Sequence, residues 1–286
     1  MMTSQAVVLL ALKASIVLSV FAVGLDAQFQ DALYLARRPA LLVRSLVAMD
    51  VVMPVVVAMI VGAFRLPPAF EIVLVALAVS PVPPLLPKKQ IGAQGDPSYT
   101  VGLLVLSAVV AIPIIPIDIE LLGRFLDAPV HMKAWPIARL GLQTILAPLA
   151  LGMAVRHFAP SIALRISKPM GLAAAILLAI SLLPILFVAW PAIIALIGNG
   201  ALAAIAAFVL VGLAVGHWFG GPDPHNRAVL ALATATRHPG IALTIATTNF
   251  PEQKAVLPAI LLYLILSAIL AIPYLQWRKR LPFPPP

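Results

Sequence analysis

Apolar runs of about 20 residues recur along the chain from Gln5 to Trp277, with short polar connections between them. A helical run of this length crosses the hydrocarbon layer of a bilayer. The runs lie near residues 5–25, 39–63, 69–86, 99–117, 136–156, 169–190, 198–219, 226–248 and 255–277. Since 62% of the residues are hydrophobic and 10% are charged, too little polar surface remains for a soluble domain. The pattern predicts an all-α polytopic membrane protein with about nine transmembrane helices in a single domain over residues 1–286.

The basic residues between the apolar runs indicate how the chain is oriented. One side of the membrane receives ten of them and the other side receives five, together with the acidic residues Asp118, Glu120 and Asp127. The ten are Arg37, Arg38, Arg44, Arg156, Arg165, Lys168, Arg227, Arg278, Lys279 and Arg280, and the five are Arg65, Arg124, Lys133, Arg139 and Lys254. Because cytoplasmic loops carry the excess of Lys and Arg, we expect a cytoplasmic C-terminus and an external N-terminus in a plasma membrane, the inner membrane of a bacterium.

Several chemistries are not expected from this composition. The net charge of +9 is not arranged as a basic stripe with interleaved aromatic residues, so nucleic acid is not an expected partner. There is no cysteine, which excludes disulfides and thiolate metal sites. The five histidines are scattered without a metal-binding spacing, and no phosphate-binding GxxxxGK[ST] loop is present. We therefore expect no enzyme activity, no cofactor and no metal site.

Prolines predict two interruptions of the membrane helices. The segment SPVPPLLPKKQIGAQGD, Ser80 to Asp96, holds four prolines and two lysines, and RHPG, Arg237 to Gly240, interrupts the eighth run. Proline removes a backbone donor, and freed backbone groups at membrane depth normally line a cavity. The expected breaks are at Pro83, Pro84, Pro87, Pro239 and Gly240. Paired broken helices are typical of secondary transporters, while the alternative is a pair of kinks that serve helix packing alone.

Four segments resemble the bile acid:sodium symporter family in order and spacing. They are FAVGL near the end of the first run, RRPALLVRSLVAMDVVMP, RLPPAFEIVLVALAVSP, and GIAL after the second break. The resemblance implies two inverted repeats, here the first four and the last five helices, in which discontinuous helices cross near the bilayer centre. These would be the third and eighth spans. It also implies that spans 1, 5 and 6 form a panel, and that spans 2–4 and 7–9 form a core bundle that rocks against it.

The chain departs from this family at the sodium ligands. The family's first crossing motif usually reads like CPGGTASN, and laid on Ser80 to Pro87 it places Leu86 and Pro87 where Ser and Asn supply oxygens. The second motif usually reads E-x-G-x-Q-N-x-G, and laid on Ala233 to Gly240 it replaces the Glu by Ala233 and the Gln by Arg237. Hard cations need several oxygen ligands, and a guanidinium repels them. We therefore predict that sodium does not couple transport.

The intramembrane basic residues are the predicted binding site. We expect Arg237, with Lys88 and Lys89, to supply the positive charge that sodium supplies in relatives, and to bind a small organic anion beside Thr236 and His238. The alternatives are that the lysines snorkel to the interface, that Thr236 satisfies backbone groups, and that His238 is a packed histidine.

One acidic residue, Asp50, is expected deep within a span, as an ion-pair partner of Arg237 or a proton-coupling group. Lys168 is expected in a loop, away from this site.

The chemistry favours a secondary transporter of an organic anion, with a proton or an exchanged anion as possible coupling partners. The alternative is a non-transporting sensor or structural relative of the same fold. Arsenite permeases have a similar fold, but the missing cysteines count against that substrate. The substrate, the coupling mode and the oligomeric state stay open.

Overall fold

The computed structural model describes residues 4–64, 66–125, 133–198 and 200–281, and within these ranges the chain forms helices and no strands. Eight helices in the described part of the chain are long and apolar enough to cross a membrane. They are Val7–Asp26, Pro39–Ala63, Pro97–Arg124, Ala134–Phe158, Pro160–Ala195, Ala201–Phe219, Pro224–Asn249 and Val256–Arg280. The prediction of an all-α polytopic membrane protein is confirmed. The inverted repeats stay a prediction.

Most spans are single helices or helices that contain a short π-helical turn. The uninterrupted ones are α1 (Ser4–Asp26), α7 (Pro97–Phe125), α10 (Pro160–Ala195), α11 (Ala201–Phe219) and α14 (Val256–Arg280). One span joins α3 (Pro39–Leu46), the π-helix η1 (Val47–Val52) and α4 (Met53–Ala63), and another joins α8 (Ala134–Gly141), η2 (Leu142–Leu146) and α9 (Ala147–Phe158). A short helix, α2 (Phe29–Ala32), follows α1.

The region predicted as a span over 69–86 is a short helix followed by a non-helical segment. The helix α5 (Pro68–Ala78) has 11 residues, and helical structure resumes only at α6 (Pro87–Gly92). The three prolines at 81, 83 and 84 supply no N–H to continue the helix, while Pro87 takes the first position of α6, where a missing N–H costs nothing. The second broken span consists of α12 (Pro224–Ala235) and α13 (Pro239–Asn249).

Four residues that were predicted to lie in two loops belong to helices instead. Asp118 and Glu120 belong to α7, which continues for 29 residues through two internal prolines. Lys168 and Arg165 belong to α10, which has 36 residues and begins at Pro160. The hydropathy pattern ends each span where polar residues begin, but helical hydrogen bonding continues into polar sequence. Arg65 and Asp127, which also entered the charge count, lie outside the described residues.

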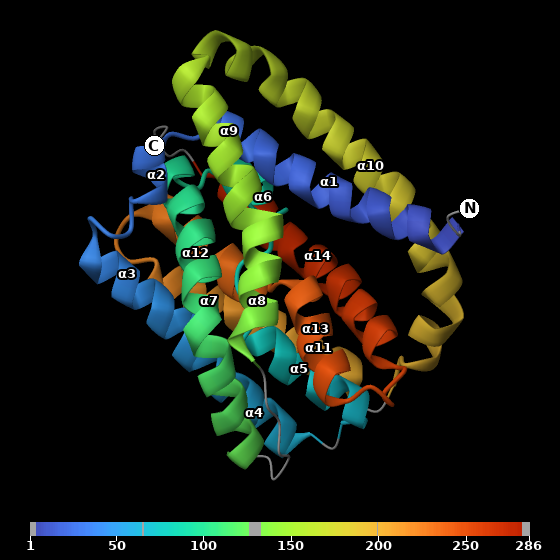
Figure 1. Ribbon diagram of the computed structural model, residues 1–286. Coiled ribbons are helices and arrows are strands. Elements are labelled where there is room, and N and C mark those ends of the chain that lie inside the picture. Colours follow the sequence, from blue (N-terminus) through green and yellow to red (C-terminus); the bar gives the residue numbers. More distant parts are fainter. Residues whose placement is uncertain (1–3, 65, 126–132, 199, 282–286) are drawn as a thin grey trace.

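The helices form two packed groups around the broken spans (Figure 1). Helix α1 lies against α9 and α10 along one side of the molecule, and α11 packs against α12 on the other. Small residues bring these pairs close: a Cβ placed on Gly24 would lie 2.5 Å from the carbonyl oxygen of Leu149, and one on Gly212 would lie 2.9 Å from Cα of Ala235. Such close approaches are typical of helix packing in membranes.

The two broken spans meet at their interruptions. Helix α13 packs against α5, and α12 contacts α6. The backbone N–H of His238, in the second break, donates to the carbonyl oxygen of Pro81 in the first break at 2.9 Å. The surrounding side chains, among them Val82 and Ala233, are fully buried. The non-helical backbone therefore lies inside the protein, as the lipid environment requires.

Candidate functional site

The second break is held by a tyrosine from the last span. Tyr263 on α14 is fully buried, its hydroxyl accepts a hydrogen bond from the Arg237 backbone N–H at 2.8 Å, and it donates to the carbonyl oxygen of Ala235 at 3.1 Å. One hydroxyl thus satisfies the last turn of α12 and the interrupted segment together. On the other side of the break, His238 caps α13, where its Nδ1 accepts from the Ile241 N–H at 3.3 Å. The break is therefore an ordered part of the fold, in which most of the main-chain polar groups have hydrogen-bond partners.

The first break exposes the carboxyl end of a half-helix. Helix α5 ends at Ala78, where the Ser80 N–H donates to the Leu77 carbonyl oxygen at 3.0 Å and the Ala78 carbonyl oxygen has no main-chain donor among the described residues. Ser80 donates to the carbonyl oxygen of Ala76 at 2.6 Å, and the Val82 N–H donates to Oγ of Ser107 at 3.3 Å. The last two carbonyl groups, those of Leu77 and Ala78, point to the second break. They carry the negative end of the helix dipole.

Arg237 satisfies these carbonyl groups. Its side chain is fully buried, its Nε donates to the Leu77 carbonyl oxygen at 3.3 Å, and its Nη2 donates to the carbonyl oxygen of Ala78. The same Nη2 donates to the carbonyl oxygen of Met49 at 2.5 Å. Its Nη1 has no partner among the described residues. The guanidinium therefore lies among three main-chain oxygens from two different spans.

The Met49 carbonyl is available because of the local helix geometry. Met49 lies in the π-helix η1, where hydrogen bonds run from residue i+5 to residue i. Five residues after Met49 is Pro54, which has no N–H. The π-helical donor to the Met49 carbonyl is therefore missing, and Arg237 provides a donor in its place.

Two carboxylates lie within electrostatic range of Arg237. Asp50 on η1 and Asp118 on α7 each interact with the guanidinium, and they interact with one another. Neither forms a salt bridge with Arg237 in the part of the chain that the structure describes. Oδ2 of Asp118 is buried and has no hydrogen-bond partner among the described residues. Asp50 therefore forms no contact ion pair with Arg237 among the described residues, and its role in coupling stays a prediction.

A cavity lies between the pair α1 and α10 and the helices α2, α6 and α7. It has a volume of about 440 Å³ and is lined by residues of α1, α2, α6, α7 and α10. Lys88 on α6 lines it and donates from Nζ to the carbonyl oxygen of Gly171 on α10 at 3.0 Å. Lys168, Asp26 and Asp31 also line it, so the cavity carries charges of both signs.

The other predicted site residues lie near the crossing or at its edge. Thr236 ends α12 in extended conformation and is partly buried, and His238 is 3% exposed with its Nε2 unpartnered among the described residues. Lys89 is exposed and is not among the residues that line the 440 Å³ cavity. Arg237 does not line that cavity either. The structure therefore brings Arg237, His238 and Thr236 together at the crossing, and places Lys88 in a separate space.

Sequence reasoning missed three participants. Tyr263 lies in an apolar run without a marker, and its role follows only from the packing of α14 against the break. Asp118 was placed in a loop, although an acidic residue one position beyond an apolar run is a recognisable candidate for the end of a span. Lys168 was treated as a loop residue, although it follows Ser167 and precedes Pro169 inside a long helix.

The chain was compared with known protein families and with curated proteins. The family model described as "Sodium Bile acid symporter family" matches residues 14–214, from the first span to the middle of α11. A search of curated proteins found no match to the chain.

Proposed function

Because the chain belongs to the sodium bile acid symporter family, a family of transporters, we propose that it is a secondary transporter of a small organic anion that works by alternating access without sodium coupling. The chain is an integral membrane protein. The proposal extends this to a plasma membrane, with the N-terminus outside and the C-terminus in the cytoplasm, as the distribution of Lys and Arg favours. It includes no enzymatic step.

One observation carries the proposal: Arg237 donates to the main-chain oxygens of Met49, Leu77 and Ala78. Carbonyl oxygens at the carboxyl end of a broken helix are a common coordination environment for a transported monovalent cation. Here the guanidinium of Arg237, a cation that belongs to the chain itself, donates hydrogen bonds to these carbonyl oxygens. A sodium ion at the same place would have to displace a guanidinium that makes charge-assisted hydrogen bonds, and would be repelled by its charge.

Protons are the coupling ions that the neighbouring side chains favour. Asp50 and Asp118 lie near Arg237 without contacting it, and the structure supplies no full counter-ion to the guanidinium among the described residues. We propose that an arriving anion and these carboxylates compete for the positive field of Arg237. Protonation of a carboxylate would then accompany binding of the anion, which couples the proton gradient to the gradient of the anion.

The anion is proposed to reach the site through the 440 Å³ cavity. This volume suits a small organic acid, and ligand pockets commonly measure about 300–1,000 Å³. Lys88 offers an ammonium group whose observed partner is a neutral main-chain carbonyl, that of Gly171. A carboxylate or sulfate is a better partner for an ammonium than a carbonyl, so the incoming anion would replace Gly171. Thr236 and His238 complete the proposed binding set at the crossing, and Lys89, which is exposed and does not line the cavity, is proposed to belong to the same set.

The packing also supports a panel and a core. Helix α1 lies against α9 and α10, and the hydrogen bond from Lys88 to Gly171 joins α6 to this group. We propose that α1, α8 to α10 form the panel and that the remaining spans form the core. In this mechanism the Lys88 contact breaks when an anion binds and the core moves against the panel.

A second candidate, a non-transporting relative, is favoured by the burial of Arg237. Its hydrogen bonds tie α5 and η1 to the second break, and a crossing fixed in this way suits a rigid ligand sensor. Counterflow in proteoliposomes distinguishes the two. Vesicles loaded with an unlabelled carboxylate are diluted into the same labelled acid, for a panel of small carboxylates and sulfates, with and without a pH gradient. A transporter accumulates label transiently. Thermal stabilisation by an acid that shows no counterflow would support the sensor instead.

A further inference from the structure

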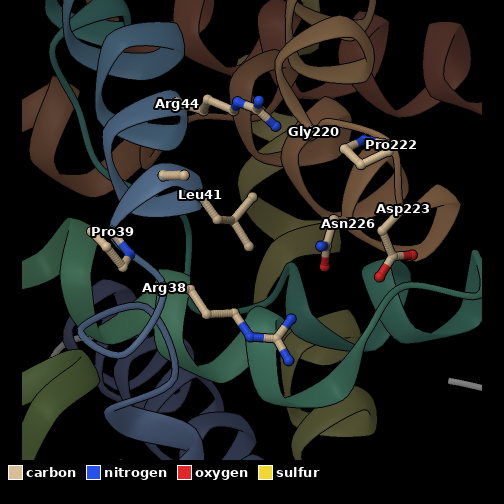
Figure 2. A pocket seen from close by; sticks show the side chains of 9 residues that line it. Arg38, Pro39, Leu41, Arg44, Gly220, Pro222, Asp223 and Asn226 are labelled. Carbon is tan, nitrogen blue, oxygen red and sulfur yellow. The ribbon is translucent and has the colours of Figure 1, made fainter.

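A second cavity lies at the arginine-rich end of the helices. It has a volume of about 370 Å³ and lies between the start of α3 and the connection from α11 to α12 (Figure 2). Arg38 and Arg44 reach into it from the α3 side, and Asp223 and Asn226 lie on the opposite wall (Figure 2). None of these residues belongs to the crossing or to the 440 Å³ cavity.

The two arginines are available for an anion. Neither guanidinium forms a salt bridge within the described residues, and Arg38 is held only against the ring of Tyr34, with 4.2 Å between its Cζ and the ring centroid. Burial and the carboxylate of Asp96 raise the pKa of the Tyr34 hydroxyl, so the ring stays neutral and offers its face to the cation. Guanidinium groups of this kind bind phosphate oxygens in pairs.

The opposite wall is held in place by two other arginines. Arg227 donates from Nε to the carbonyl oxygen of Gly221 at 2.6 Å, and Arg278 donates from Nη2 to that of Pro224 at 2.8 Å. Gly221 has a φ of +81°, and a Cβ there would lie 2.5 Å from Nη1 of Arg44. The positive φ favours glycine at this turn, and the absence of a Cβ leaves room for the end of the Arg44 side chain.

This wall carries two hydrogen-bonding side chains, and the acceptor of one of them has no donor among the described residues. Asn226 is only 6% exposed, and its Oδ1 has no partner among the described residues. Asp223 uses Oδ1 to accept from the His225 N–H at 2.8 Å, and its carboxylate also lines the cavity. A bare anion would meet Asp223 unfavourably. A ligand with a phosphate next to an ammonium or hydroxyl group matches both walls.

The surroundings indicate where such a ligand comes from. Close in sequence to the cavity residues, Val43 is 54% exposed and Trp218, at the end of α11, is 86% exposed. Exposed apolar and tryptophan side chains next to arginines are typical of the headgroup level of a bilayer. Basic pockets between membrane helices bind lipid phosphates.

We propose that this cavity binds a phosphate group accompanied by a hydrogen-bond donor, as in the headgroup of phosphatidylethanolamine, with the phosphate on Arg38 and Arg44 and the donor on Asn226 and Asp223. Free hydrogen phosphate offers the same chemistry. The two sources are distinguished by experiment.

The test is native mass spectrometry of the full chain in lipid-free detergent. The protein is titrated with dioctanoyl phosphatidylethanolamine, with dioctanoyl phosphatidylcholine, which has the same phosphate but no donor, and with inorganic phosphate. We expect phosphatidylethanolamine to bind at least tenfold more tightly than phosphatidylcholine. Arg38→Gln and Arg44→Gln should each weaken this binding roughly tenfold, which corresponds to about 1.4 kcal/mol.

The control variant is Arg37→Gln combined with Arg165→Gln, compared with the Arg38→Gln, Arg44→Gln double variant. Both double variants remove two exposed positive charges, and neither control residue lines the cavity. Loss of binding only in the Arg38→Gln, Arg44→Gln double variant supports the site. The ligand is then a lipid headgroup if phosphatidylethanolamine binds more tightly than inorganic phosphate, and it is free phosphate if inorganic phosphate binds as tightly. Equal binding to both double variants, or equal binding of the two lipids to the unmodified chain, overturns the proposal.

Discussion

Replacing Arg237 by Gln tests the site at its centre. A hydrogen bond to a charged donor contributes about 1.5–3 kcal/mol, and an arginine near the bilayer centre costs about 2.5–3.5 kcal/mol. Arg237 makes three side-chain bonds of this kind, to Met49, Leu77 and Ala78, so the bonds outweigh the cost. The shorter, neutral Gln leaves most of these oxygens unpaired, and we expect a net destabilisation of about 1–4 kcal/mol. Uptake of the anion should fall at least tenfold, because the positive field is lost.

The assay combines thermal unfolding in detergent with initial uptake rates in proteoliposomes, at matched protein incorporation. Arg165→Gln is the control, because Arg165 is exposed on α10 and the chemical change is identical. Its stability should change by less than about 0.5 kcal/mol. Arg237→Lys keeps the positive charge but loses the planar guanidinium. Its stability and its uptake rate should lie between those of Arg237→Gln and Arg165→Gln. Equal uptake by Arg237→Gln and Arg165→Gln would remove Arg237 from the mechanism.

Three further predictions follow from particular contacts. Lys88→Gln should raise the KM for the anion about tenfold with a smaller change in kcat, while Lys254→Gln, in an exposed turn, should leave both unchanged. Asp118→Asn should retain counterflow but abolish stimulation by a pH gradient; undiminished stimulation would exclude Asp118 from coupling. Gly216→Ala should destabilise the chain by about 1–3 kcal/mol, because the new Cβ meets the hydroxyl of Thr234 and the carbonyl of Leu230, whereas Gly62→Ala, with open space, should be neutral or stabilising in thermal unfolding.

The positions of the breaks were accessible from the sequence because proline acts locally. Isolated prolines such as Pro113 in α7 are accommodated within a helix, but the closely spaced Pro83 and Pro84 lie in the non-helical segment, and Pro87 and Pro239 start α6 and α13. The helical membrane architecture was equally accessible, since it depends on run length and composition. The family match over residues 14–214 confirms the family resemblance, while the inverted repeats and the division into panel and core stay predictions.

The partners of the site residues were not accessible, because they are main-chain atoms. Arg237 was expected to bind an organic anion or to pair with Asp50, whereas it donates to carbonyl groups at a helix end and in a π-helical turn. No side-chain pattern encodes those oxygens. Asp118 and Lys168 were misplaced for a related reason: hydropathy finds the apolar part of a helix, not its ends.

The most direct test is the initial rate of anion uptake into proteoliposomes as external sodium is replaced stepwise by choline, with the substrate taken from the counterflow panel. If the Arg237 guanidinium occupies the position of a sodium ion, the uptake rate without sodium should equal the rate in full sodium within about twofold, because no vacant sodium site is expected. A rate that falls to background without sodium would show that an ion still binds where the guanidinium is proposed to replace it.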